Sequence, residues 1–239
     1  MVRHEPKSQL LLVWLLDHFR SHPKTIAKLK LRLVDQGMTE LDRLDKWRPP
    51  AVDVTEVERA TASAAWQAYQ ATTPEACFDL LSQDLRALPL IRPALTDLLK
   101  ELPSSSTGLG ATEMRMLELI SEGNACPPDV FPGHEKRNKR RVFGYWEIGA
   151  LLDGLARCPM PVVSGLDEGP FTLEMHEDRD RHARYKQSRL SLTKFGQAVL
   201  AGHEDFSRHN PIHRWCGGTE LTNDRLWRRD PVNHALIAP

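Results

Sequence analysis

The sequence contains no long hydrophobic run, no closely spaced cysteines and no excess of either charge. Its longest apolar stretch, Leu10–Leu16, has seven residues, whereas a membrane-spanning helix needs about 20. This stretch ends at Asp17 and His18 without a small-residue cleavage site, which argues against a signal peptide. We therefore expect a protein with no membrane partner.

The cysteines are few and far apart. There are four in 239 residues, and no two form a C-x-x-C pair: Cys77, Cys126, Cys158 and Cys216. This pattern argues against a disulfide scaffold or a zinc ribbon and is typical of a reducing compartment. The chain is long enough for one large or two small domains, each with its own core. We expect a cytoplasmic protein.

The net charge is zero, because 32 lysines and arginines balance 32 aspartates and glutamates. Proteins dedicated to nucleic acid usually carry a basic excess, since phosphate neutralisation supplies most of their affinity. Nucleic-acid binding would thus require a local basic patch. The sequence also lacks a P-loop, a dinucleotide fingerprint, a nucleophile elbow and a Ser-His-Asp order. It predicts no cofactor and no catalytic residue, and it favours a binding protein over an enzyme.

Residues 1–103 are predicted to form a helical segment. Apolar residues at helical spacing indicate four helices: over 8–20, over 54–71, from Pro74 onward and over 90–102. The first is apolar almost all round, which predicts burial on several sides. Leu29–Leu33 alternates apolar and basic residues, as a strand with one buried face does. No partner strand is evident nearby, so distant residues, another chain or a missing segment must complete its sheet.

Residues 104–202 are predicted to form a winged-helix-like module. Its first helix begins at Gly110, with Glu113 at the capping-box position, and ends at Gly123. A second helix is expected over 144–157. Two strands, Pro161–Val163 and Ser188–Leu192, would then flank a long charged hairpin, and a short helix would end the module. Within the hairpin three apolar residues alternate like an extra strand of an enlarged wing: Phe171, Leu173 and Met175.

The order of helices, strand, wing and strand is that of a winged helix-turn-helix. Residues 203–239 form a Trp- and Arg-rich tail that is expected to pack back onto a domain. The predicted fold class is mainly α (α+β): a helical N-terminal segment followed by a winged helix-turn-helix module with a small antiparallel sheet.

Four stretches resemble an uncharacterised bacterial family, the domain of unknown function numbered eighteen-thirty-five. They are Arg3–Leu10, Leu88–Leu90 with Pro103-Ser104 and Gly108-Leu109, Thr112–Leu119, and Arg214–Thr219 with Leu226–Asp230. The resemblance implies an N-terminal α/β region that precedes the part represented here, which would explain an unpaired strand at Leu29–Leu33. Arg3 and Ser8 stand where the family pattern has acids. The resemblance therefore implies a fold and at most a remnant polar site: His4, Glu5, Arg214 and Trp215.

The strongest functional signal is a basic run just before the second helix of the module. Together with the arginines of the expected wing, it predicts a nucleic-acid contact surface: Lys136, Arg137, Lys139, Arg140, Arg141, Arg179, Arg181 and Arg184. A solvated charged loop is the alternative interpretation. The helix itself offers Tyr145, Trp146 and Glu147, which do not suit base readout in a major groove and are more typical of core or docking residues.

Two further clusters contain metal-capable side chains. Met175–His182 has interleaved arginines and is interpreted as a solvated wing tip. The second cluster matches no zinc spacing: His203, His209, His213 and Cys216. We therefore predict no metal. The leading hypothesis is a non-enzymatic winged-helix regulatory or binding protein that contacts nucleic-acid backbone or a protein partner. The alternatives are a protein-interaction module or homodimer without nucleic acid, and a degenerate enzyme that lacks its α/β half.

Overall fold

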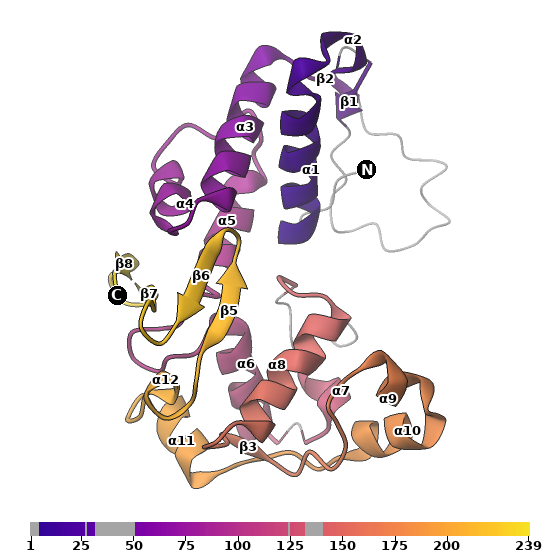
Figure 1. The fold of residues 1–239 in the computed structure, drawn as a ribbon, viewed down its shortest axis with the longest axis vertical. Coiled ribbons are helices and arrows are strands. Elements are labelled where there is room, and N and C mark those ends of the chain that lie inside the picture. Colours follow the sequence, from indigo (N-terminus) through magenta and orange to yellow (C-terminus); the bar gives the residue numbers. More distant parts are fainter. Residues whose placement is uncertain (1–4, 27, 32–50, 124, 132–140) are drawn as a thin grey trace. The chain divides into compact units, whose positions relative to one another are not determined.

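A computed structural model describes residues 5–26, 28–31, 51–123, 125–131 and 141–239 (Figure 1). Two compact units emerge from the contacts of the chain. Unit 1 contains Met1–Leu99 and Trp215–Thr219, and unit 2 contains Lys100–Arg214 and Glu220–Pro239. Segment boundaries at residues 103 and 203 stay a prediction.

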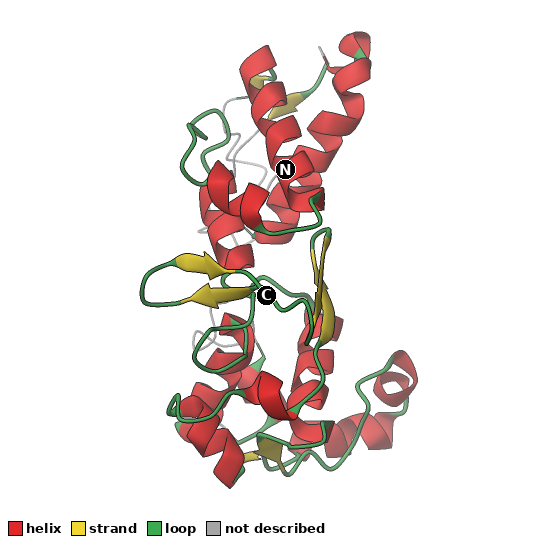
Figure 2. Cartoon of the chain, turned by 60° about the vertical axis from the view of Figure 1, so that its left-hand side comes forward, coloured by secondary structure: helices red, strands yellow, loops and turns green. Residues whose placement is uncertain are grey.

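Helices dominate both units, and the strands of the described residues form four small two-stranded sheets (Figure 2). The predicted α+β class with small antiparallel sheets is confirmed. Within the same part of the chain, none of the helices combines the length and the apolar character that crossing a bilayer demands.

Unit 1 is built from helices that pack around one apolar core. Its elements are α1 (Pro6–His18), the 3-10 helix η1 (Phe19–Ser21), α2 (Pro23–Ile26), β1 (Lys30–Leu31), β2 (Val52–Asp53), α3 (Glu56–Gln70), α4 (Glu75–Leu80) and α5 (Ile91–Leu99). Helix α1 packs against α3 and α5 and buries Leu12, Val13 and Leu16. Its other side remains in solvent, since Leu11 is 61% and Trp14 is 40% exposed. The expectation that this helix is buried on several sides is therefore wrong.

The strand expected at Leu29–Leu33 is present as β1, and it has a partner in the same chain. Lys30 pairs with Asp53 and Leu31 with Val52 in antiparallel register. Among the three sources considered for the missing partner, distant residues of this chain supply it. An absent α/β region is not needed to explain β1.

Unit 2 contains the remaining elements. They are α6 (Ala111–Ser121), α7 (Pro127–Val130), α8 (Tyr145–Arg157), β3 (Val163–Ser164), α9 (Leu173–Glu177), α10 (Arg179–Gln187), β4 (Ser191–Leu192), α11 (Lys194–Leu200), α12 (Phe206–His209), β7 (Arg228–Asp230) and β8 (Ala235–Ile237), with the hairpin strands β5 (His213–Cys216) and β6 (Thr219–Thr222), whose tip is grouped with unit 1. The capping box predicted for the first helix is confirmed, because Glu113 Oε2 accepts from Gly110 N at 2.8 Å.

The two strands predicted to flank the wing are confirmed. Val163 pairs with Leu192 and Ser164 with Ser191, and β4 leads into α11, where Thr193 Oγ1 accepts from Gly196 N at 2.9 Å. The hairpin and the extra strand between them are wrong, because α9 and α10 occupy that segment. Met175 is buried in α9, whereas Leu173 at the start of the same helix is 59% exposed, and the buried Phe171 precedes the N-cap Thr172.

Two side chains start these short helices. Thr172 Oγ1 accepts from Met175 N at 3.3 Å, and Asp178 Oδ1 accepts from the amides of Asp180 and Arg181. Such caps satisfy amides that a helix leaves unpaired at its N-terminus. These caps favour helix over strand in a segment that has too few apolar residues for their spacing to distinguish the two.

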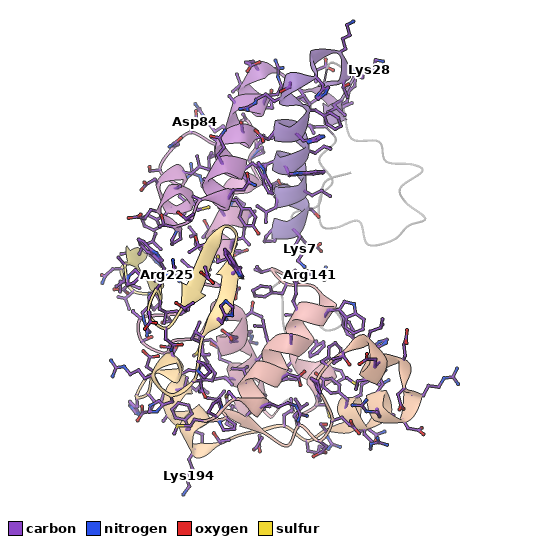
Figure 3. All side chains as sticks on the ribbon, viewed as in Figure 1. Lys7, Lys28, Asp84, Arg141, Lys194 and Arg225 are labelled. Carbon is purple, nitrogen blue, oxygen red and sulfur yellow. The ribbon has the colours of Figure 1, made fainter. Side chains whose placement is uncertain are left out.

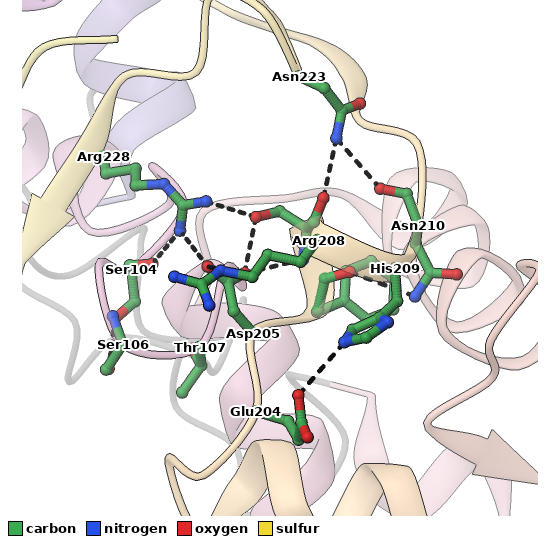
Figure 4. A network of polar contacts seen from close by, with 12 residues as sticks. Ser104, Ser106, Thr107, Glu204, Asp205, Arg208, His209, Asn210, Asn223 and Arg228 are labelled. Carbon is green, nitrogen blue, oxygen red and sulfur yellow. Dashed lines mark hydrogen bonds and ion pairs between the residues drawn. The ribbon is translucent and has the colours of Figure 1, made fainter.

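The C-terminal tail is fixed within unit 2 by a polar network (Figure 4). Arg228 Nη1 donates to Asp205 Oδ2 at 2.8 Å, and its Nη2 donates to Ser207 Oγ at 2.5 Å. Asn223 Nδ2 donates to the Ser207 carbonyl at 2.8 Å. Because Asp205 is buried, its charge needs these partners. Arg228 Nη1 also donates to the Ser104 carbonyl at 3.1 Å, and the packing of the tail as a whole onto a domain stays a prediction.

Two glycines of α8 give opposite predictions. A Cβ at Gly149 would overlap the ring of Phe171, whereas a Cβ at Gly154 meets nothing within 4 Å. We expect Gly149→Ala to destabilise the protein by about 1–3 kcal/mol through overpacking. Gly154→Ala should instead stabilise it by about 0.5–1 kcal/mol, because alanine favours a helix. Chemical denaturation of both variants tests this, and a loss of stability in both would contradict it.

Candidate binding surface

A cluster of seven rings lies around the first turn of α8 and is called the ring cluster below. Its members are Phe131, Tyr145, Trp146, Phe171, His176, His182 and Tyr185. Phe171 is its centre, with ring centroids 5.1 Å from Tyr145, 5.4 Å from Trp146 and 4.9 Å from Tyr185. These separations are those of favourable aromatic pairs.

Local sequence explains how α8 presents its first two rings. Gly144 is the N-cap, and its amide donates to Glu147 Oε2 at 2.6 Å. Tyr145 and Trp146 therefore occupy the first helical turn. One turn further along, Gly149 leaves room for Phe171, and Asp153 accepts a hydrogen bond from the Phe171 amide. Burial raises the pKa of Asp153, while this hydrogen bond and Arg157 act in the opposite direction.

The ring cluster is buried at its centre and open at its edge. Phe171 is 6% and Tyr185 is 2% exposed, whereas Tyr145 is 43% and Trp146 is 44% exposed. Large aromatic rings held half in solvent are typical of contact surfaces. Of the two roles that the sequence suggests for Tyr145 and Trp146, core and docking, their exposure favours docking.

Two imidazoles border the exposed rings. His176 lies against both, with ring centroids 5.7 Å from Tyr145 and 5.2 Å from Trp146. His182 follows at 4.2 Å from His176, and its Nε2 is 3.5 Å from the Tyr145 hydroxyl. Burial, then His176 and Lys186, lower the pKa of His182, which favours its neutral form near pH 7. No group of three or more metal-capable side chains occurs in the described segments.

Helix α10 carries cations on two separate flanks. On one flank, Arg181 Nε lies 3.2 Å from Glu168 Oε2, and Arg184 Nη2 lies 2.7 Å from Glu168 Oε1. Arg179 and Lys186 share the other flank with His182, since spacings of three and four residues coincide on a helix. Both are exposed, and no carboxylate of the described residues pairs with them.

The predicted nucleic-acid contacts thus separate into three groups. Lys136, Arg137, Lys139 and Arg140 lie outside the described residues, and Arg141 is exposed just before α8. Arg181 and Arg184 bind Glu168, whereas Arg179 shares the other flank of α10 with His182. Sequence reasoning missed Lys186, although the spacing of Arg179, His182 and Lys186 would have indicated it once the segment was taken as helical.

The predicted remnant polar site is only partly described. His4 lies outside the described residues, and Glu5 is the N-cap of α1 without a side-chain capping bond. Arg214 Nη1 lies 3.0 Å from Glu113 Oε2, the carboxylate that caps α6, and Trp215 is 63% exposed. Arg214 thus has a structural role at the start of α6.

The dual ion pair of Glu168 predicts a pH-dependent stability. Hydrogen bonds from Arg184 and then Arg181 lower the pKa of Glu168 below its ordinary 4.5. A lowered pKa stabilises the fold above the unfolded-state value, and this contribution is lost as the pH falls below it. Glu168→Gln should therefore reduce the melting temperature near pH 7, and the gap from wild type should narrow below pH 4.5.

Thermal melts across this pH range provide the measurement. Glu174→Gln is the matched control, because Glu174 is an exposed carboxylate of α9 for which the described residues supply no partner. An equal decrease of the melting temperature in the two variants near pH 7 would contradict the role of Glu168. So would a difference in melting temperature between Glu168→Gln and wild type that does not depend on pH.

Comparison with known proteins gives no match: no family model, no curated protein and no solved structure is similar to this chain. The resemblance to the domain of unknown function stays a prediction.

Proposed function

We propose that unit 2 is a winged-helix-type module that acts without catalysis, by contacting the phosphate backbone of a nucleic acid. The order α6, α7, α8, β3, β4 and α11 supports this type of module. It departs from a simple wing because α9 and α10 stand between β3 and β4. The contact surface would be α10 rather than a β-ribbon.

The carrying observation is a pair of exposed cations on α10, for which the described part of the chain supplies no carboxylate partner. Arg179 and Lys186 lie on the flank of His182, which contacts Tyr145 at the start of α8. Exposed cations for which the described residues supply no carboxylate partner are available to phosphates, whereas Arg181 and Arg184 share the single carboxylate of Glu168. The basic run 136–141 precedes α8 in the sequence, and Arg141, its one member among the described residues, is exposed.

Removal of these charges should weaken nucleic-acid binding and flatten its salt dependence. Each lost phosphate contact reduces the slope of log K against log[salt] by roughly 0.7–0.9. Arg179→Gln with Lys186→Gln should thus lower the slope by roughly 1.5 and the affinity by about tenfold near physiological salt. Fluorescence anisotropy with a labelled oligonucleotide measures both, and a second variant that replaces the cations of 136–141 tests the basic run.

A matched control removes the same charge elsewhere. Lys28 is an exposed lysine of unit 1, and Lys194 is an exposed lysine that points into solvent at α11 (Figure 3). Lys28→Gln with Lys194→Gln should leave the affinity nearly unchanged. Equal losses in the two double variants would show a general charge effect and end the proposal of a specific surface.

A protein partner is the second candidate, favoured by the exposed apolar residues Tyr145, Trp146 and Leu173. A second copy of the chain would be such a protein partner. Light scattering coupled to size exclusion distinguishes it: a stable homodimer that Trp146→Ala disrupts, without nucleic-acid binding, would favour this candidate.

A further inference from the structure

The exposed rings at the start of α8 are held in fixed positions. Trp146 lies 5.4 Å from Phe171 and 5.2 Å from His176, and its plane is inclined by 68° to the imidazole. Tyr145 lies 5.1 Å from Phe171 and 5.7 Å from Phe131, edge to face with both. Rings supported in this way lose little conformational entropy when a ligand stacks on them. Tyr145 and Trp146 are called the platform below.

The chemistry of α8 suits stacking better than groove readout. Base edges in a major groove are read by Arg, Lys, Asn or Gln, and the first turn of α8 offers Tyr145, Trp146 and Glu147 instead. The carboxylate of Glu147 is also engaged with the Gly144 amide at 2.6 Å. Stacking needs only the face of a ring, and every base presents one.

Charge divides the surroundings of the platform into two sides. On the α10 side, His182 touches the Tyr145 hydroxyl at 3.5 Å, and the same flank carries Arg179 and Lys186. On the α9 side, Glu177 follows His176, which contacts both platform rings. The cations Arg179 and Lys186 attract phosphates on the first side, where Asp178 and Asp180 also flank Arg179, and Glu177 repels phosphates on the second. A strand would thus lie along α10 with its bases turned toward the platform.

We propose that the platform stacks unpaired bases, so that the ligand of unit 2 is single-stranded nucleic acid whose phosphates are held by Arg179 and Lys186. This inference rests on the proposed function. It narrows that function, because a duplex keeps its bases stacked inside and offers the platform nothing beyond its backbone.

The test uses the full chain and three labelled probes. They are an oligothymidylate of about 20 nucleotides, a duplex of the same length, and a heparin oligosaccharide as a polyanion without bases. The oligothymidylate should bind about tenfold or more tightly than the duplex and quench tryptophan fluorescence. Trp146→Ala should weaken its binding about five- to a hundredfold, the value of one stacked base, while heparin binding stays unchanged.

Two further variants protect the test from misfolding and general effects. Trp146→Phe keeps a stacking face and should retain most of the affinity. Trp14→Ala is the matched control, because Trp14 is similarly exposed at 40% but belongs to α1 of unit 1; it should bind as wild type. Circular dichroism melts check that each variant folds.

The outcomes separate the inference from the function on which it rests. If the Arg179→Gln/Lys186→Gln variant loses affinity and Trp146→Ala does not, the inference is overturned and the backbone contact stands. Equal affinity for duplex and oligothymidylate also overturns it. If no probe except heparin binds the wild type, the nucleic-acid function fails as well.

Discussion

The packing of Phe171 against α8 is the contact on which the arrangement of the binding surface depends. This one ring touches Phe131, Tyr145, Trp146 and Tyr185, so it joins α7, α8 and α10. The approach is possible because Gly149 has no side chain. The Phe171 amide is bound by Asp153 of the same helix. Backbone and side chain of Phe171 are therefore both fixed to α8, and the chain that follows starts α9 in a defined place.

The second determinant is the division of α10 into two flanks. Glu168 accepts both Arg181 and Arg184, and this anchors α10 to the loop before Phe171. Tyr185 points inward to the ring cluster. The remaining flank carries Arg179, His182 and Lys186, and His182 Nε2 lies 3.5 Å from the Tyr145 hydroxyl of the platform. Arginines that look equivalent in the sequence thus differ on the helix, because Arg181 and Arg184 bind Glu168 and Arg179 lies on the other flank.

Local signals explain what the sequence predicted well. The capping of α6 by Gly110 and Glu113 involves residues three apart, so it can be predicted from the sequence. The pairing of β3 with β4 follows from short apolar segments beside prolines and polar residues. By contrast, the alternation of Phe171, Leu173 and Met175 fits a strand. This pattern takes no account of the capping residues Thr172 and Asp178, which favour helices in this segment.

Non-local contacts explain what the sequence could not supply. The partner of β1 lies beyond a segment of 20 residues, and the ion pairs of Glu168 join residues 13 and 16 positions apart. Neither follows from periodicity or composition. The same holds for the ring cluster, whose aromatic members come from four separate places in the chain. The sequence indicates that Tyr145 and Trp146 do not suit base readout, but only the fold shows which side chains surround them.

The ends of the segment that contains α9 and α10 have a consequence of another kind. Ser164 and Ser191 face each other across β3 and β4, and Gly165 approaches the carbonyl of Arg189 so closely that a Cβ would overlap it. The segment between β3 and β4 thus begins and ends at adjacent positions. An inserted segment whose ends are adjacent can become longer, become shorter or be replaced in evolution while the paired strands keep their register.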